Sequence, residues 1–221
     1  MTFKLDEQKD ILLFPTPVGV NFYDKELTKQ QIDFILELEK SKNTGNLTTV
    51  NKTILNHELF LDLKKFILEN IEVFYKKWYS PPKNTSIYLT QSWANYTEQG
   101  SFHHRHYHFN SLVSCVFYPL VSEDESEPDK ITFHSSHSGH SIFTRQIGVE
   151  PVEFNPFNSQ TWWIPVKKNQ LIIFPSTLEH SVENKPTAGT RISISANTFI
   201  EGDLGNDQNL THLHLNKSEI Y

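Results

Sequence analysis

Four histidines lie within six consecutive positions of this chain, in the segment His103-His104-Arg105-His106-Tyr107-His108. Neutral imidazoles at such close spacing can bind a transition metal. Far downstream follow one more histidine, His180, and an arginine, Arg191. A histidine pair, a long gap, one histidine and then an arginine is the order expected of an iron site that also holds a small dicarboxylate.

The histidine cluster is expected to form a strand with metal ligands on one face. Residues two apart in a strand point to the same face, so His106 and His108 would project together, with His104 aligned and His103 opposite. Exposed histidines in a loop are the alternative. The apolar and aromatic residues around the cluster favour the metal site.

An acidic metal ligand is missing from this part of the chain. No carboxylate occurs between Glu98 and Glu123, so the carboxylate of a facial iron triad cannot come from this strand. His180 follows an apolar run and a Pro-Ser turn, which would place it at the rim of a β-barrel. A lone histidine there is more often structural, so its assignment depends on the arginine that follows it.

The segment from Arg191 to Asn197 alternates strictly between two kinds of residue. One face would carry Ile192, Ile194 and Ala196, and the other Arg191, Ser193, Ser195 and Asn197. An ordinary amphipathic strand with a wet polar face also has this pattern. The charge on the polar face is a single arginine beside small hydroxyls, which suits a carboxylate: a guanidinium donates two parallel hydrogen bonds, and a serine can add a third.

Length and composition limit the kind of protein that carries these residues. The 221 residues are expected to form one domain. The formal net charge of −6 offers no basic surface to a phosphate backbone or an anionic membrane, which disfavours nucleic acid as a partner. No apolar run approaches the ~18 residues needed to span a bilayer. The single cysteine, Cys115, excludes an intrachain disulfide, and the first residues lack the apolar run of a signal peptide, so a cytoplasmic protein is expected.

Helices are predicted first and strands afterwards. Apolar residues recur at helical spacing in Leu27–Lys42, behind Thr28 as N-cap, and in Asn56–Tyr79, which Pro81-Pro82 ends. Short β-like runs follow, namely Ile87–Tyr96, Leu112–Tyr118, Ile131–Phe133, Thr161–Ile164, Leu171–Phe174 and Thr190–Phe199. Helices packed on an antiparallel barrel or sandwich are therefore predicted.

Other histidines and the tryptophans receive simpler interpretations. Exposed loop positions are expected for His134, His137 and His140, with a second site as the alternative. Surface positions in a polar tail are expected for His212 and His214. Core positions are favoured over pocket walls for Trp93, Trp162 and Trp163.

A series of short motifs runs through most of the chain in a fixed order: Leu13-Phe14-Pro15-Thr16-Pro17-Val18, Ser92-Trp93-Ala94-Asn95, Gly100 with His103, His106 and His108, Ser114, Phe174-Pro175-Ser176, His180-Ser181-Val182 and Arg191-Ile192-Ser193-Ile194-Ser195-Ala196-Asn197. In this order and spacing the series resembles the 2-oxoglutarate/Fe(II)-dependent oxygenases of bacteria and bacteriophages. The order of the motifs is more specific than any one of them.

The resemblance implies a mainly β fold with supporting helices, in which the core is a double-stranded β-helix, also called a jelly roll or cupin-like barrel. Residues 1–221 would then form a single oxygenase-like domain. Its parts would be a helical N-terminal region at about 1–82, a β-helix core at about 85–200 and a C-terminal tail at 201–221.

The resemblance also implies Fe(II) as a cofactor and three metal ligands. By position, His106 and His180 correspond to the iron-binding histidines of the family. His108 lies where related oxygenases outside this subfamily carry Asp or Glu, so the implied triad contains only histidines.

The second implied cofactor is 2-oxoglutarate. Arg191 matches the residue that anchors its far carboxylate, helped by Ser193, and Asn95 and Tyr118 are weaker candidates for lining its pocket. The implied activity is that of a dioxygenase that hydroxylates a substrate, a protein residue among the options, and releases succinate and CO2. Neither the substrate nor the oligomeric state follows from the sequence.

Two positions depart from the family pattern, since Cys115 and Asn169 stand where relatives have glycine. Asparagine tolerates the left-handed backbone conformation. Two other functions remain open: a cupin-type three-histidine metalloprotein that works without 2-oxoglutarate, and a non-catalytic module with a structural zinc whose fourth ligand would be His103 or His104. The oxygenase hypothesis requires that the three rings converge and that no internal acidic side chain engages Arg191.

Overall fold

The computed structural model describes residues 15–122, 127–135 and 151–216. In chain order, the helices and strands are β1 (Gly19–Phe22), α1 (Lys29–Glu37), β2 (Lys40–Asn43), β3 (Asn46–Thr49), two 3-10 turns (Ile54–Asn56 and Glu58–Phe60), α2 (Leu61–Tyr79), β4 (Thr85–Thr97), β5 (His103–His106), β6 (Val113–Leu120), β7 (Lys130–His134), β8 (Thr161–Pro165), β9 (Gln170–Pro175), β10 (His180–Val182), β11 (Arg191–Leu204) and β12 (Leu213–Leu215).

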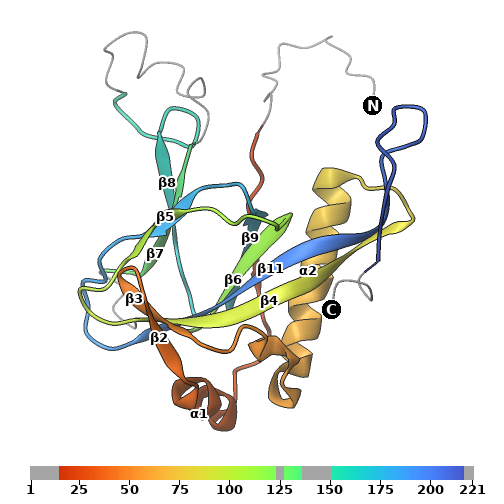
Figure 1. The fold of residues 1–221 in the computed structure, drawn as a ribbon. Helices are drawn as coiled ribbons and strands as arrows, with labels where there is room; N and C mark the ends of the chain where they lie inside the picture. Colours follow the sequence, from red (N-terminus) through yellow and green to blue (C-terminus); the bar gives the residue numbers. More distant parts are fainter. Residues whose placement is uncertain (1–14, 123–126, 136–150, 217–221) are drawn as a thin grey trace.

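The strands form two antiparallel sheets that face each other. The larger sheet has the order β1-β9-β6-β11-β4-β3-β2, with β12 paired to β11, and the smaller has the order β5-β10-β7-β8. Figure 1 shows α2 lying along the outer side of the larger sheet. The fold is thus mainly β with a double-stranded β-helix core and supporting helices, and the predicted fold class is confirmed.

The first helix begins where the sequence predicts and ends earlier. Thr28 is its N-cap and forms a capping box with Gln31, in which each side chain bonds the backbone of the other residue. The helix ends at Glu37, because the chain turns into the hairpin of β2 and β3, whose turn contains Gly45 at φ 89°. The predicted helix to Lys42 is wrong over these last residues.

The second helix starts after the two 3-10 turns and ends at Tyr79, followed by Ser80 in the left-handed conformation and then the two prolines. Its apolar face packs on the larger sheet in a core that also contains Ile192, Ile194 and Ala196 of β11. The predicted alternation of β11 is confirmed, since these three side chains are at most 1% exposed.

The opposite face of the larger sheet looks toward the smaller one. Aromatic and aliphatic side chains of both sheets pack there in a second apolar cluster, made of Val116, Tyr118, Ile131, Phe133, Val166, Ile172 and Phe174. The polar residues of β11 lie on this side too. One sheet therefore supplies an apolar face to the helices and a partly polar face to a space between the sheets.

Two predicted details of the chain have clear outcomes. Asn169 adopts φ 61°, so asparagine does occupy a left-handed position before β9. Trp162 and Trp163 on the edge strand β8 are 40% and 51% exposed, so their predicted core positions are wrong. Trp93 is half-buried and lines the space between the sheets, so for this residue the pocket wall, and not the favoured core position, is correct.

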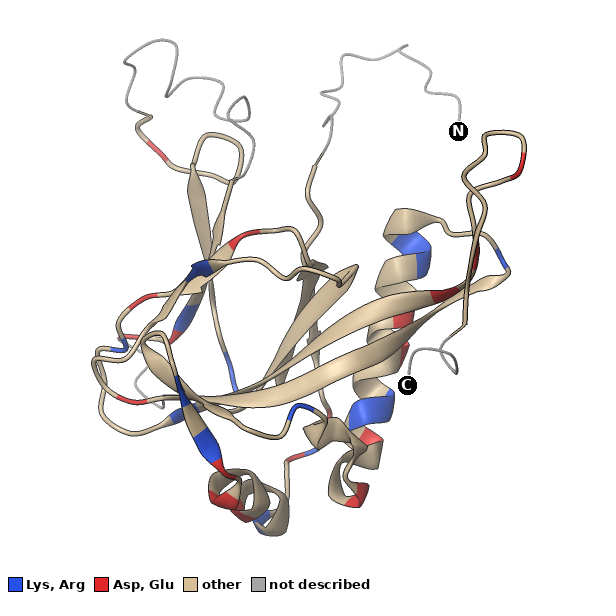
Figure 2. Ribbon diagram, in the orientation of Figure 1, with Lys and Arg blue, Asp and Glu red and all other residues tan. Residues whose placement is uncertain are grey.

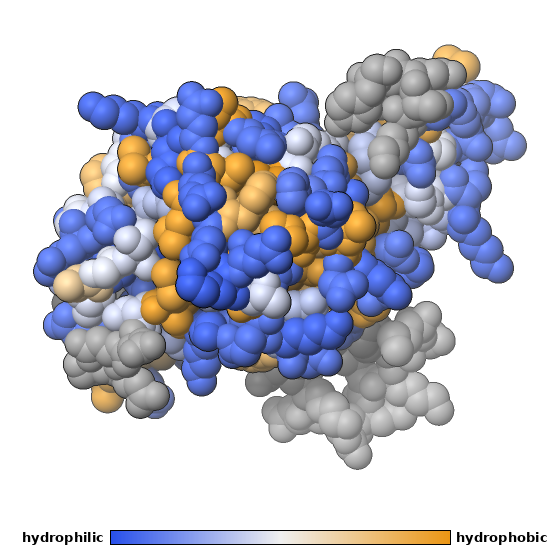
Figure 3. Space-filling model, turned by 90° about the horizontal axis from the view of Figure 1, so that it is seen from below, coloured by the Kyte–Doolittle hydropathy of each residue, from blue (hydrophilic) through white to orange (hydrophobic). Residues whose placement is uncertain are grey.

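The surface mixes residue types. Lys and Arg alternate with Asp and Glu along both helices, while the strands carry few charges (Figure 2). On the face seen from below, hydrophobic side chains gather near the middle among hydrophilic ones (Figure 3). Within the described ranges, no helix combines the length and the apolar character needed to cross a membrane.

Candidate metal pocket

A pocket between the two sheets brings together the histidines and the arginine that the sequence singles out. Its lining includes His106, His108 and His180 from the smaller sheet and its adjoining segments, and Arg191 from the larger sheet. Each of the three histidines offers one ring nitrogen, and these atoms all lie within 4.8 Å of one another. The expected convergence of the three rings is therefore present.

Strand pairing sets this convergence. His106 and His180 are direct partners in the antiparallel pair of β5 and β10, and their ring centroids lie 4.3 Å apart. Opposed residues on one face of such a pair bring their side chains within contact distance. The backbone N–H of His108 donates to the carbonyl of Ser176, at 3.0 Å, which holds the third histidine beside the same segment.

A bulge in this strand pair changes the predicted face of two other histidines. The pairing register shifts between His180 and Val182, which face His106 and His103, so β5 has one residue more than β10 over this stretch. His103 consequently lines the pocket and stacks on His106 at 4.3 Å, whereas His104 is exposed. The predicted placement, with His104 aligned and His103 opposite, is wrong because strict alternation assumes an unbroken ladder.

Backbone carbonyls orient two of the three rings. Nδ1 of His106 lies 2.7 Å from the carbonyl of His104, and Nδ1 of His180 lies 3.0 Å from the carbonyl of Leu178. A carbonyl only accepts, so each Nδ1 carries the proton and donates it. The lone pair is then on Nε2, and such an arrangement fixes both the tautomer and the direction of a metal-binding histidine.

Burial keeps these imidazoles neutral. It lowers the pKa of His106, lowers that of His108 to about 4 with a further contribution from His106, and lowers that of His180 well below its usual range. The pKa of His103 is lowered to about 3, again first by burial and then by its histidine neighbours. Neutral imidazole is the form that binds a metal.

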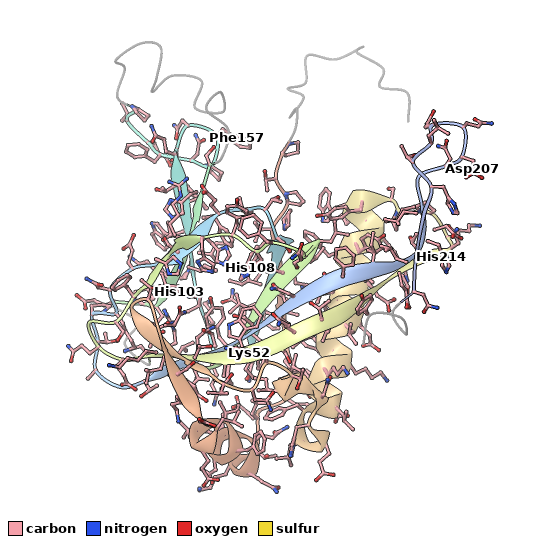
Figure 4. All side chains as sticks on the ribbon, viewed as in Figure 1. Lys52, His103, His108, Phe157, Asp207 and His214 are labelled. Carbon is pink, nitrogen blue, oxygen red and sulfur yellow. The ribbon has the colours of Figure 1, made fainter. Side chains whose placement is uncertain are left out.

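Aromatic side chains pack around the histidines. The ring of Phe174 lies 4.7 Å from that of His180, with Phe133 at 6.3 Å, and Trp93 lies 5.7 Å from His108. These contacts restrict the rotamers of the candidate ligands and exclude water from one side of the pocket. Figure 4 labels His103 and His108, and both side chains line this pocket.

Arg191 is buried and engaged by an acidic side chain, against expectation. Its Nη1 donates to Oδ1 of Asp129 at 3.2 Å, and the two side chains are only 4% and 2% exposed. Its Nη2 donates to Oγ1 of Thr97, the residue opposite it on β4, at 3.1 Å. The requirement of a guanidinium without an internal acidic partner is contradicted, because Asp129 enters from the segment before β7.

The guanidinium nevertheless keeps a donor for a ligand. Nε of Arg191 is buried and has no hydrogen-bond partner, in a residue that lines the same pocket as the three histidines. Ser193 and Ser195 of the same strand face also line it. A buried unpaired donor beside hydroxyls suits a ligand that carries acceptor oxygens, as 2-oxoglutarate does.

The weaker candidates for this pocket are placed as expected. Asn95 lies opposite Ser193 in the pairing of β4 with β11, and its Nδ2 donates to Ser195 Oγ at 3.2 Å while its Oδ1 has no partner. Tyr118 lines the pocket, and burial raises the pKa of its hydroxyl, with Arg191 opposing this shift and Asp129 adding to it. Both side chains are at most 4% exposed.

Sequence reasoning missed three buried polar residues of this site, Thr97, Asp129 and Asn46. Thr97 could have been found from its position opposite Arg191, had the strand register been known. Asp129 directly precedes β7, and this position next to a strand with an apolar centre is the signal that could have found it. Asn46 comes from the unpredicted hairpin, and its buried Oδ1 is unpaired.

The remaining histidines lie away from the pocket or outside the described residues. The exposed loop position predicted for His134 is wrong, because this residue ends β7, is partly buried and hydrogen-bonds Ser181 Oγ at 2.8 Å. His137 and His140 fall outside the described ranges. His212 and His214 are on an exposed hairpin, as predicted for surface residues.

Residues 91–197 match the model of a family described as "Putative 2OG-Fe(II) oxygenase". The matched stretch contains the three histidines, Arg191, Ser193, Asn95 and Tyr118. The match supports the predicted class of enzyme, a 2-oxoglutarate-dependent oxygenase, and the predicted cofactors, Fe(II) and 2-oxoglutarate. Comparison with curated proteins found no match.

Solved structures with a similar fold come from several bacteria. HygX from Streptomyces hygroscopicus, with nickel, 2-oxoglutarate and hygromycin B bound, is 9% identical with a TM-score of 0.53 over 83% of this chain and 82% of that one. A prolyl-4-hydroxylase from Pseudomonas putida is 12% identical with a TM-score of 0.51 over 83% and 92%. An oxidoreductase of the 2OG-Fe(II) oxygenase family from Burkholderia pseudomallei is 10% identical with a TM-score of 0.51 over 76% of each chain. At these identities the likeness concerns the fold alone.

Proposed function

We propose that this chain is a 2-oxoglutarate-dependent hydroxylase in which His106, His108 and His180 hold Fe(II). When bound, iron and 2-oxoglutarate use O2 to hydroxylate a C–H bond of the substrate, with release of succinate and CO2. The chain's own residues would bind, orient and shield: three neutral imidazoles supply the metal ligands, and Arg191, Ser193 and Asn95 hold the far end of the cosubstrate.

The observation that carries the proposal is the convergence of three ring nitrogens within 4.8 Å, with two of the rings held by backbone carbonyls. An open three-ligand set leaves coordination positions free, which a catalytic metal needs and a structural zinc usually lacks. Among the described residues the group comprises these three histidines without His103 or His104. This speaks against the structural-zinc alternative.

One observation favours a second candidate function. Because Asp129 already engages Arg191, the chain could be a three-histidine metalloprotein that binds its substrate directly and has no use for 2-oxoglutarate. In that case the guanidinium would serve only to balance a buried carboxylate. The two functions differ in one measurable property, the binding of 2-oxoglutarate to the metal-loaded protein.

The test is a titration of 2-oxoglutarate into the Fe(II)-loaded protein without oxygen. For the wild type we expect a visible absorption band from the chelated 2-oxo acid, saturating with added ligand. His180→Ala should show no band because the metal is not held. The band should persist in His214→Ala, a matched change of an exposed histidine. Iron binding without any 2-oxoglutarate binding would overturn the proposal in favour of the three-histidine alternative.

The substrate class needs a separate experiment. Neither the pocket lining nor the charge of the chain selects among proteins, small molecules and nucleobases, and fold does not determine substrate. A succinate-release assay against a panel of peptides and metabolites would identify it. Turnover that stays at the uncoupled background for every member would direct the search to substrates outside those classes.

A further inference from the structure

Asp129 lies behind the arginine of the proposed cosubstrate site, on the side away from the histidines. Arg191 lines both the metal pocket and a neighbouring cleft, whereas Asp129 lines only the cleft. The carboxylate is thus in contact with the guanidinium without occupying the space for a ligand. The Nε of Arg191 is buried and unpaired, so the guanidinium keeps one donor that neither Asp129 nor Thr97 engages.

The carboxylate is fixed in this position. One oxygen accepts from Arg191 and the other accepts the backbone N–H of Ser122 at 2.9 Å. The backbone carbonyl of Asp129 accepts the N–H of Val166 at 2.9 Å. Because the two side chains are only 4% and 2% exposed, water and salt screen their charges weakly.

The charge of Asp129 has a counterpart in the composition of the metal site. A facial triad with one carboxylate lowers the charge of bound Fe(II) by one unit, and three neutral histidines do not. Among the described residues that line the metal pocket, Arg191 is the only one with a permanent charge. The negative charge that the triad lacks is instead supplied at the other end of the site by Asp129, which pairs with Arg191.

We propose that Asp129 is a specificity-determining residue that sets the charge of the cosubstrate pocket, offsetting the charge that an all-histidine metal site leaves on Fe(II). This inference rests on the proposed function and concerns the same site. With Asp129 in place, binding of a dianionic 2-oxo acid leaves the pocket neutral. Without it, the pocket keeps a positive charge and holds dianions more tightly.

A consequence is that the wild-type pocket discriminates weakly at the far end of the ligand. An arginine whose charge is already balanced gains less from a carboxylate than a free arginine does. We therefore expect the chain to accept 2-oxo acids whose far group is a neutral hydrogen-bonding group, such as an amide, nearly as well as 2-oxoglutarate.

The experiment compares two ligands and three proteins, each loaded with Fe(II) and kept without oxygen. The ligands are 2-oxoglutarate and its analogue with an amide at the far end, and the readout is the dissociation constant from absorption or calorimetry. In Asp129→Asn the preference for 2-oxoglutarate over the amide should rise by roughly 10- to 100-fold, as expected from removing a like charge nearby in a medium of low dielectric constant.

Glu183→Gln is the matched control, since it removes the charge of an exposed carboxylate that lines the same neighbouring cleft, where water screens that charge. Its preference should stay within about twofold of the wild type. An unchanged or lowered preference in Asp129→Asn would overturn the inference and leave the proposed function standing. If the wild type binds neither ligand, both fall.

The wild type alone provides a second measurement, should Asp129→Asn fail to fold with an unbalanced buried arginine. A preference for 2-oxoglutarate below about tenfold supports a balanced pocket. A preference above about tenfold would mean that the arginine acts as a free charge, and it would overturn the inference.

Discussion

Two groups of histidines in this chain lie on opposite parts of the molecule and have different surroundings. His106, His108 and His180 lie between the sheets with their ring nitrogens close together. His212 and His214 lie on the exposed hairpin of β11 and β12, where both pair with Asp203. Figure 4 shows His108 in the interior of the barrel and His214 on the distant hairpin.

The difference lies in burial and in what fixes the rings. Backbone carbonyls and aromatic rings hold the inner group, which is His106, His108 and His180, and burial lowers the pKa of its members. The outer group, His212 and His214, is 46% and 60% exposed and is held by hydrogen bonds to Asp203 that water can replace. A cluster of histidines in a sequence therefore indicates a metal site only where the fold also buries and orients the rings.

The largest expected effect is on metal affinity. His180→Ala removes one of three ligands and should weaken Fe(II) or Co(II) binding by more than about 100-fold, since even loss of a supporting contact costs about 10- to 100-fold. His214→Ala should change the affinity by less than about twofold. Anaerobic titration calorimetry measures both, and equal losses in the two variants would erase the distinction between the groups.

Metal removal should affect stability next. At a free metal concentration about 100 times the dissociation constant, binding adds about 2.7 kcal/mol to the free energy of unfolding. A chelator should remove this increment from the wild type and from His212→Ala, and should leave His180→Ala unchanged. Urea unfolding with and without chelator tests it; a chelator effect that persists in His180→Ala would place the metal elsewhere.

A smaller effect is expected for the hydroxyl network before His180. Ser176 Oγ donates to Ser111 Oγ at 2.7 Å and lies 2.8 Å from Ser114 Oγ, and both Ser176 and Ser114 are buried. Ser176→Ala should cost about 1–3 kcal/mol of unfolding free energy and reduce metal affinity by about tenfold. Thr211→Ala, in the exposed turn of the hairpin, should stay within about 0.5 kcal/mol. An equal metal affinity in Ser176→Ala and wild type would show that the network does not position His180.

The smallest effect concerns the outer group itself. Hydrogen bonds from His214, then His212 and Asn84, lower the pKa of Asp203 from its usual value of 3.8. The ionised carboxylate of Asp203 slightly stabilises the folded chain above pH 3.8. This contribution is lost as the pH falls through the lower pKa that Asp203 has in the folded chain. In His214→Ala the carboxyl should titrate closer to 3.8 in an NMR experiment, and added salt should reduce the difference. An unshifted pKa of Asp203 in the wild type would contradict these hydrogen bonds.

Periodic elements could be predicted from the sequence, and irregular ones could not. The two-residue alternation of β11 and the capping box of α1 are local patterns, so they appear in the sequence as they do in the fold. The hairpin of β2 and β3 was missed because Lys40–Asn43 is polar and carries no apolar alternation. Its pairing partner is β4, far along the chain, and that pairing stabilises it.

The same division applies to the site. The convergence of His106, His108 and His180 was expected from their order and spacing. The position of His103 depended on a bulge, and the partner of Arg191 depended on which buried acid the next strand delivers. Both features depend on tertiary structure, since the position of His103 follows from strand register and the partner of Arg191 from packing between the sheets.

The direct pairing of His106 with His180 joins two points separated by roughly 70 residues of chain. An ion bound by both would close a loop of that length, and the entropy lost on closure is larger for a long loop than for a short one. Metal binding would thus stabilise the pairing of β5 with β10, and these two strands must meet before the ion is held. During folding the sheet would form first and the ion would bind second. The metal-free and the metal-loaded protein would therefore differ most in how readily β5 and β10 separate.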